Sequence, residues 1–263
     1  MDDPYVLISE PQRIVRLLKD DPPASRKTKY SALVVLCGQD SDEACEVYRQ
    51  KMMDDSEIVR HNEKAQKKTD KQTEAWMDWD DIIKRADEVG RVAKQVMKKQ
   101  RLNKDDWKAL ESYLITLLYT SQEPRRLLDW VQMRIKGDAM EDENYIEKNN
   151  TWVFRNYKTR SHYGTQKMPI SKKLKTFLKY WKSITPDTHV MLLHDSNGNP
   201  MNVQQLNSRI NKIWEKDGLG ANGLRHSYLT WVYKDMEPLA EMEERARRMG
   251  HSFEEALTYI KRD

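Results

Sequence analysis

Residues able to carry out acid–base and nucleophilic chemistry lie in four short stretches of the sequence. The stretch PRRLLDW, residues 124–130, places Arg126 at the head of a helix or tight turn. Asp129 follows three residues later, a spacing at which two side chains share one face of a helix. The stretch RNYKTRSHYG, residues 155–164, places Lys158 at the edge of a hairpin turn. The first two stretches therefore offer two cations and one carboxylate.

The other two stretches lie near the C-terminal end of the sequence. In NGLRHSYLTW, which begins at Asn222, the residues Arg225 and His226 stand at the start of an expected helix. In MGHSFEEALTY, His251 stands at a helix start, and Tyr259 follows eight residues later, about two turns along the same helix. These stretches add a second arginine, imidazole groups and a phenol.

Together these residue types suit the transfer of a DNA 3′-phosphate onto tyrosine. Two guanidinium groups can hold the non-bridging oxygens of one phosphodiester without losing their charge. A lysine can protonate a departing 5′-oxygen. A tyrosine hydroxyl, with an ordinary pKa near 10, becomes a useful nucleophile when nearby cations neutralise the charge that develops on phosphorus. Cysteine and histidine are few and not at ligand spacing, so we expect neither a metal nor another cofactor.

The four stretches, in this order, resemble the tyrosine recombinase (phage integrase) superfamily. Arg126-Leu127-Leu128-Asp129 is similar to the R-x-x-E/D turn of its first arginine, and Tyr157-Lys158-Thr159 to the turn of its lysine. Asn222-Gly223-Leu224-Arg225-His226 resembles the H-x-L-R-H box, and Met249-Gly250-His251-Ser252 the L-G-H-S box. The resemblance covers roughly residues 76–263. The sequences PRRLLDW and YKTRSHYGTQKMPI are most similar to those of integrases from viruses and mobile elements of eukaryotes.

Two departures from the family pattern concern chemistry. Asn222 replaces the first histidine of the second box; an amide can hydrogen-bond a phosphate oxygen but cannot carry a proton. The spacing from His251 to Tyr259 is one residue shorter than is usual, which rotates Tyr259 by about 100° on an ideal helix. A loop in place of a regular helix would absorb that rotation.

The resemblance implies a site-specific recombinase or integrase that cleaves and rejoins duplex DNA through a 3′-phosphotyrosine intermediate, without metal or ATP. Tyr259 would be the nucleophile, Lys158 the acid, and Asp129 would position Arg126. The phosphate would be held by a larger set, comprising Arg126, Arg225 and His251, with Asn222 in a lesser role and His226 beside them. Four protomers, monomeric in solution, would form a tetramer on two duplexes.

Two alternatives stay open. The same chemistry would serve a type IB topoisomerase-like or telomere-resolving enzyme. A DNA-binding relic, inactivated through Asn222 and the shifted Tyr259, would bind DNA without cleaving it. Each stretch alone also has a structural explanation: surface ion pairs, a hairpin-edge lysine, helix caps or a packed tyrosine. The order of the four stretches favours one shared site.

Composition limits the class of protein. The 263 residues are 33% charged and 38% hydrophobic, and no apolar run approaches the roughly 20 residues that span a bilayer. No signal peptide is visible, and Cys37 and Cys45 do not suggest a disulfide framework. We therefore expect an intracellular protein without membrane association, located with its target DNA: in the nucleus or a virus factory of a eukaryotic host, otherwise in the cytoplasm.

Charge and periodicity predict two domains. Residues 1–75 hold 13 Lys and Arg against 15 Asp and Glu, and the rest hold 33 against 27, so the basic excess lies in the C-terminal part. The polar run 61–75 marks a boundary near residue 75, between a helical core-binding domain (1–75) that clamps DNA and a catalytic domain (76–263). Arg26, Lys27 and Lys29 are the candidate phosphate contacts of the first domain, although a solvated helix face explains them equally well.

The expected fold is mainly α with a small three-stranded antiparallel sheet, a tyrosine recombinase catalytic fold preceded by a small helical bundle. Strands are expected at 131–135, 151–157 and 164–170, the last two as a hairpin. Helical spacing of leucines predicts a buried helix at 102–120. Further helices are expected at 8–20, 25–38, 40–55, 77–100, 171–184, 202–216, 223–235, 238–249 and 252–262.

Overall fold

The chain divides into two compact units, each built around its own core. The computed structural model describes all residues except 1–9, 38–42, 149, 196, 251 and 259–263. One unit is formed by residues 68–234, and the other by 1–67 together with 235–263. This division groups the last helices with the first, whereas the sequence predicts a single boundary near residue 75.

Among the described residues of the unit that contains 1–67 and 235–263, the regular elements are all helices. Its helices are α2 (Pro11–Leu17), α3 (Pro23–Cys37), α4 (Glu43–Lys64), α13 (Leu239–Arg248) and α14 (Phe253–Thr258). Tyr30, Leu33 and Tyr48 form the small core between α3 and α4. The end of α4 contacts α13 through the Lys64–Glu243 ion pair, whose nitrogen and oxygen are 2.7 Å apart.

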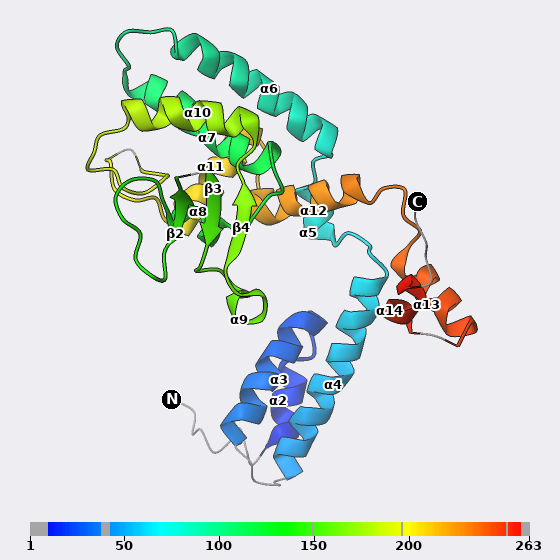
Figure 1. Cartoon of the computed structure of the whole chain (residues 1–263). Helices are drawn as coiled ribbons and strands as arrows, with labels where there is room; N and C mark the ends of the chain where they lie inside the picture. Colours follow the sequence, from blue (N-terminus) through cyan, green and yellow to red (C-terminus); the bar gives the residue numbers. More distant parts are fainter. Residues whose placement is uncertain (1–9, 38–42, 149, 196, 251, 259–263) are drawn as a thin grey trace. The chain divides into compact units, whose positions relative to one another are not determined.

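The unit of residues 68–234 combines a small sheet with helices (Figure 1). Its helices are α5 (Asp70–Glu74), α6 (Trp79–Val96), α7 (Lys104–Thr120), α8 (Leu127–Val131), α9 (Arg160–Tyr163), α10 (Lys172–Ile184), α11 (Val203–Trp214) and α12 (Gly220–Val232). Helix α7 begins at a capping box in which the Asn103 side chain accepts from the Asp106 N–H and the Asp106 carboxylate accepts from the Asn103 N–H. No helix among the described residues is long and apolar enough to cross a bilayer.

The sheet has four strands, in the order β1 (Met133–Arg134), β2 (Asn144–Glu147), β3 (Thr151–Phe154) and β4 (Gln166–Pro169). Strands β3 and β4 form the expected antiparallel hairpin, with Val153 opposite Lys167. The predicted three-stranded antiparallel sheet is wrong in two respects: β2 lies between β1 and β3, and β1 pairs with β2 in parallel. The mainly helical character with a small sheet is confirmed.

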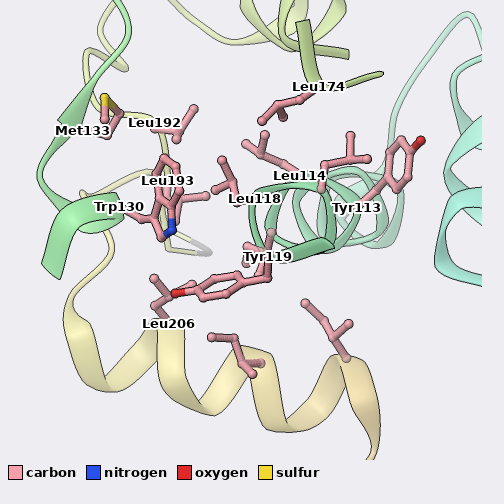
Figure 2. Close-up of a cluster of buried hydrophobic side chains, with 14 of the residues drawn as sticks. Tyr113, Leu114, Leu118, Tyr119, Trp130, Met133, Leu174, Leu192, Leu193 and Leu206 are labelled. Atoms are coloured by element: carbon pink, nitrogen blue, oxygen red, sulfur yellow. The ribbon is translucent and has the colours of Figure 1, made fainter. Parts of the chain in front are cut away.

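The core of this unit lies around α7, which is buried along most of its length (Figure 2). Trp130 on α8 packs edge-to-face against Trp152 and Phe154 of β3, with ring centroids 5.1 and 5.6 Å apart. Leu206 and Ile210 of α11 are fully buried in the same cluster. These contacts fix α8 between the sheet and α11, and α8 directly follows the first candidate arginine.

Candidate functional site

Arg126 lies in extended backbone at the residue that precedes α8. Its φ and ψ angles are −70° and 155°, and its side chain makes no capping hydrogen bond. The side chain of its neighbour Arg125 packs against the sheet, over the ring of Phe154 on β3. The Arg126 side chain is half-buried, and it forms no hydrogen bond or ion pair with any residue that the structure describes.

The Asp129 carboxylate forms its ion pair with the side chain of Arg125, and Arg126 acts on it through its charge and its backbone. Its Oδ2 atom lies 2.9 Å from Nε of Arg125. The prediction placed Arg126 and Asp129 on one helix face; Arg126 is instead the residue that caps α8, and the Asp129 N–H donates to the Arg126 carbonyl over 3.2 Å. Burial raises the pKa of Asp129, and the charges of Arg125 and Arg126 oppose this shift. Asp129 thus still lies within the electrostatic influence of Arg126.

The start of α12, which carries the second arginine, is fixed by two side chains of α11. The Gly220 N–H donates to Oδ1 of Asn211 over 2.8 Å, and the Ala221 N–H donates to Oδ1 of Asn207 over 3.4 Å. Gly220 has φ +50°, and a Cβ atom there would lie 2.5 Å from Oδ1 of Asn207. Because α11 also packs against α8, it positions both arginine-bearing segments relative to each other.

Arg225 extends from the first turns of α12 into the neighbourhood of Arg126. Burial and the positive charge of Arg126 lower the pKa of Arg225 from its ordinary value, while the charge of Asp129 opposes this effect. Its Nη1 atom donates to Oδ1 of Asn222 over 3.4 Å, a long hydrogen bond to a neutral group. A guanidinium stays protonated despite such a shift, so Arg225 and Arg126 are two neighbouring cations whose repulsion the Asp129 charge offsets only in part.

Tyr119, at the end of α7, forms the buried side of this cluster. Its ring is fully buried, and its hydroxyl has no hydrogen-bond partner among the described residues. Burial and the charge of Asp129 raise the pKa of Tyr119, whereas Arg225 lowers it. The site therefore comprises three arginines, Arg125, Arg126 and Arg225, around one buried carboxylate and one neutral phenol.

Lys158 lies on the exposed turn between β3 and β4, as predicted. The turn contains the short helix α9, at the tip of the hairpin in Figure 1. The Tyr157 hydroxyl donates to the Gly164 carbonyl over 2.7 Å and closes the base of this turn. Lys158 forms no ion pair with any described residue. The ring of Tyr157, its neighbour, lies under the Arg125 guanidinium, 5.3 Å away.

The remaining predicted residues of the site are only partly described. Asn222 and His226 are both exposed on α12, one turn apart, and Asn222 is the one that bonds Arg225. His251 and Tyr259 lie outside the described residues, so their predicted roles rest on the sequence. The structure thus brings together Arg126, Arg225, Asn222 and Asp129, and it links the turn of Lys158 to them.

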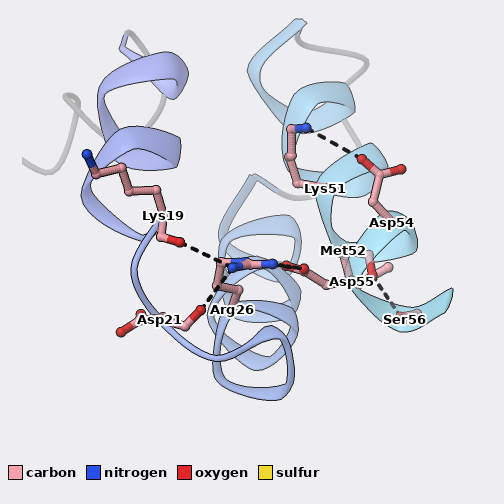
Figure 3. A network of polar contacts seen from close by, with 8 residues as sticks. All are labelled: Lys19, Asp21, Arg26, Lys51, Met52, Asp54, Asp55 and Ser56. Atoms are coloured by element: carbon pink, nitrogen blue, oxygen red, sulfur yellow. Dashed lines mark hydrogen bonds and ion pairs between the residues drawn. The ribbon is translucent and has the colours of Figure 1, made fainter. Parts of the chain in front are cut away.

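Of the candidate phosphate contacts in the N-terminal helices, Arg26 is already engaged within the unit (Figure 3). Its Nε atom lies 3.0 Å from the buried carboxylate of Asp55 on α4, and its Nη1 atom donates to the carbonyls of Lys19 and Asp21. Lys29 pairs with the Asp21 carboxylate over 2.7 Å at a partly exposed position. These contacts give Arg26 a structural role and leave Lys27 without an ion pair to a described residue.

A pocket of about 370 Å³ lies near the beginning of α7, away from the arginines that follow its end. Trp107 and Trp181 form its apolar wall, and a buried ion pair joins Glu111 to Arg209 over 2.8 Å. No group of His, Cys, Asp and Glu residues in the described part of the chain is arranged to hold a metal ion. The buried carboxylate of this pocket, Glu111, is thus already paired with Arg209.

Sequence reasoning missed two residues that organise the site, Arg125 and Asn144. Arg125 was passed over because its spacing to Asp129 did not fit the motif, although i and i+4 residues pair readily. Asn144 begins β2, a strand whose polar sequence ENYIEK resembles a loop. Its amide is fully buried, and an isolated asparagine between charged residues gives no sequence signal of burial.

Comparisons with known proteins found no match: no family model matches the chain, and no curated protein or solved structure is significantly similar to it.

Proposed function

We propose that this protein is a DNA strand transferase of the tyrosine recombinase type, which cleaves and rejoins duplex DNA through a 3′-phosphotyrosine. The observation that carries the proposal is the cluster of Arg126 and Arg225, two guanidiniums from segments about 100 residues apart in sequence. They lie close enough for one charge to lower the pKa of the other, and no carboxylate among the described residues forms an ion pair with either side chain. A phosphodiester would relieve their repulsion and occupy their donors.

The reaction would proceed as an in-line exchange at phosphorus. The Tyr259 oxygen forms a bond to phosphorus and its proton passes to water, while the bond from phosphorus to the 5′-oxygen breaks. Lys158 gives a proton to that 5′-oxygen and regains one from solvent. Arg126 and Arg225 hold the two non-bridging oxygens, on which charge accumulates. The 5′-hydroxyl of a partner duplex reverses the step, and the phenol recovers a proton.

The other residues have supporting roles in this proposal. Asn222 holds Arg225 and can donate to a phosphate oxygen through its amide. His251 completes the phosphate contacts, and a tetramer on two duplexes provides the partner strands. Because the energy of the broken bond is kept in the phosphotyrosine, no nucleotide is consumed.

A plasmid assay tests the reaction class without knowledge of the target site. Supercoiled plasmid is mixed with protein, quenched with SDS and examined for protein-linked DNA and relaxed topoisomers. We expect an adduct with the wild-type protein and none with Tyr259→Phe. An adduct that persists in Tyr259→Phe would show that another residue is the nucleophile. DNA binding without any adduct, on plasmid or on the native site, would identify an inactive DNA-binding protein.

A further inference from the structure

We infer that Arg125 is a positioning residue that holds the turn bearing Lys158 in register with Arg126. This inference rests on the proposed function, because it assigns Arg125 to the placement of the acid and not to the phosphate. Arg125 and Arg126 are neighbours in the sequence, yet their surroundings differ completely. Of the two, Arg125 alone has a side chain that hydrogen-bonds to other described residues.

The contacts of Arg125 reach three different elements. Its Nε atom is 2.9 Å from Oδ2 of Asp129 on α8. Its Nη1 atom donates to Oε1 of Gln166 on β4 over 2.9 Å and lies 3.4 Å from the Met168 sulfur. The guanidinium stacks on Phe154, the last residue of β3, 3.7 Å from the ring centroid. Since its side chain is only 13% exposed, these contacts leave it little access to a ligand.

Asn144 on β2 makes a second connection, from α8 to the residues that follow β3. Its Nδ2 atom donates to the carbonyls of Asp129 and Asn156, over 3.3 and 2.9 Å. Its Oδ1 atom accepts from the N–H groups of Arg155 and Asn156, over 2.9 and 2.8 Å. Asn156 lies two residues before Lys158, so the backbone that leads to the lysine is fixed to α8.

The contacts of Arg125 and Asn144 hold the hairpin turn in one position relative to α8, and this turn carries Lys158. Lys158 itself is exposed and has no ion pair with a described residue, so its position depends on the backbone that carries it. A general acid must lie within hydrogen-bond reach of the leaving oxygen, and a displacement of about 1 Å can cost about 100-fold in rate. Arginine suits this place because its planar fork can stack and donate in two directions, which lysine cannot do.

The experiment compares two substrates that differ only in the leaving atom. The bond cleaved by the wild-type protein is first located by sequencing the free 5′ ends. A duplex is then made with sulfur in place of the bridging 5′-oxygen at that bond, because a thiolate leaves without a proton. We expect Arg125→Lys to cleave ordinary DNA about 10- to 100-fold more slowly and the sulfur substrate within about threefold of wild type. Lys158→Ala should give the same pattern with a larger loss.

A matched control and a second variant separate positioning from folding. Arg134→Lys alters an arginine of similar exposure on β1, paired with Glu143, and should leave both rates unchanged. Tyr157→Phe keeps the ring under Arg125 but removes the bond to Gly164 that closes the turn. Tyr157→Phe should therefore also cleave ordinary DNA more slowly and the sulfur substrate at nearly the wild-type rate. This result can be obtained even if Arg125→Lys folds poorly.

Hydrogen exchange gives a reading that does not depend on activity. Arg125→Lys should speed amide exchange over residues 155–164, and Arg134→Lys should not. Equal losses on the oxygen and sulfur substrates, or unchanged exchange in the turn, would overturn the role of Arg125. Absence of cleavage by the wild-type protein would instead count against the proposed function, while the exchange result would still decide the structural connection.

Discussion

At the residue scale, the sequence predicts the identities of the charged groups better than their partners. Arg126, Arg225 and Asn222 could be selected from their motifs, and the structure brings them together. The partner of Asp129 could not be predicted from the motif, because the choice between Arg125 and Arg126 depends on where the helix begins. Arg126 stands in extended backbone before α8, and the carboxylate of Asp129 pairs with the Arg125 side chain.

His194 supplies a pH-dependent prediction at the same scale. Its ring is buried and stacks on His189, with centroids 4.1 Å apart. Burial, and then the charge of His189, lower the pKa of His194 to about 4 from 6.5. Between these values the unfolded chain binds a proton that the folded chain does not. The free energy of unfolding should therefore fall by about 2 kcal/mol as the pH falls from 6.5 to 4.

The measurement is urea unfolding of the wild-type protein and His194→Gln at several values between pH 7 and 4. Other groups titrate in this window, so the difference between the two proteins isolates the histidine. The variant should show the shallower dependence on pH. Identical slopes would show that His194 does not stay neutral in the folded unit.

At the element scale, long periodic segments are predictable and the connections between them are less so. The buried helix expected at 102–120 is α7, which spans Lys104–Thr120, and the hairpin expected around Lys158 is formed by β3 and β4. Strand β2 was missed because its sequence is polar and one of its inward side chains is Asn144, whose four hydrogen bonds replace apolar packing. Only a sequence method that knew those partners could have found it.

Gly220→Ala tests the junction between α11 and α12. The substitution strains a backbone with φ +50° and drives Cβ against the Asn207 amide that caps α12. We expect the free energy of unfolding of this unit to fall by about 2–3 kcal/mol. Gly137→Ala is the matched control, since Gly137 has φ +72° but no atom nearer than 3.7 Å to an added Cβ. An equal loss in both variants would show that backbone strain alone matters and that the cap does not.

At the scale of the whole molecule, the two cores should respond separately to substitution. All eight tryptophans, from Trp76 to Trp231, lie in the unit of residues 68–234. Tryptophan fluorescence therefore reports the unfolding of that unit alone, whereas far-ultraviolet circular dichroism reports helices in both. The sequence predicts two domains from a charge shift and a polar run, but it gives no sign that residues 235–263 belong with the first helices, because such grouping arises from tertiary contacts.

Asp55→Ala should expose this separation. It removes the partner of Arg26 and leaves a partly buried guanidinium with only carbonyl acceptors. We expect a loss of about 2–3 kcal/mol in the circular dichroism transition and an unchanged fluorescence midpoint. Asp54→Ala, which removes only an exposed pair with Lys51, should change stability by less than about 0.5 kcal/mol. A fluorescence midpoint that moved with Asp55→Ala would mean that the two units unfold together.

The grouping of residues 235–263 with the first 67 also has a consequence for biosynthesis. A ribosome adds residues from the N-terminus at about 5–20 per second, and domains generally fold as they emerge. Residues 68–234 are then complete while the other unit still waits for α13 and α14. Under the proposed function, the phosphate-binding arginines would be assembled on the nascent chain before the segment with the nucleophile is translated. A chain that stalls late in translation would bind DNA without being able to cut it.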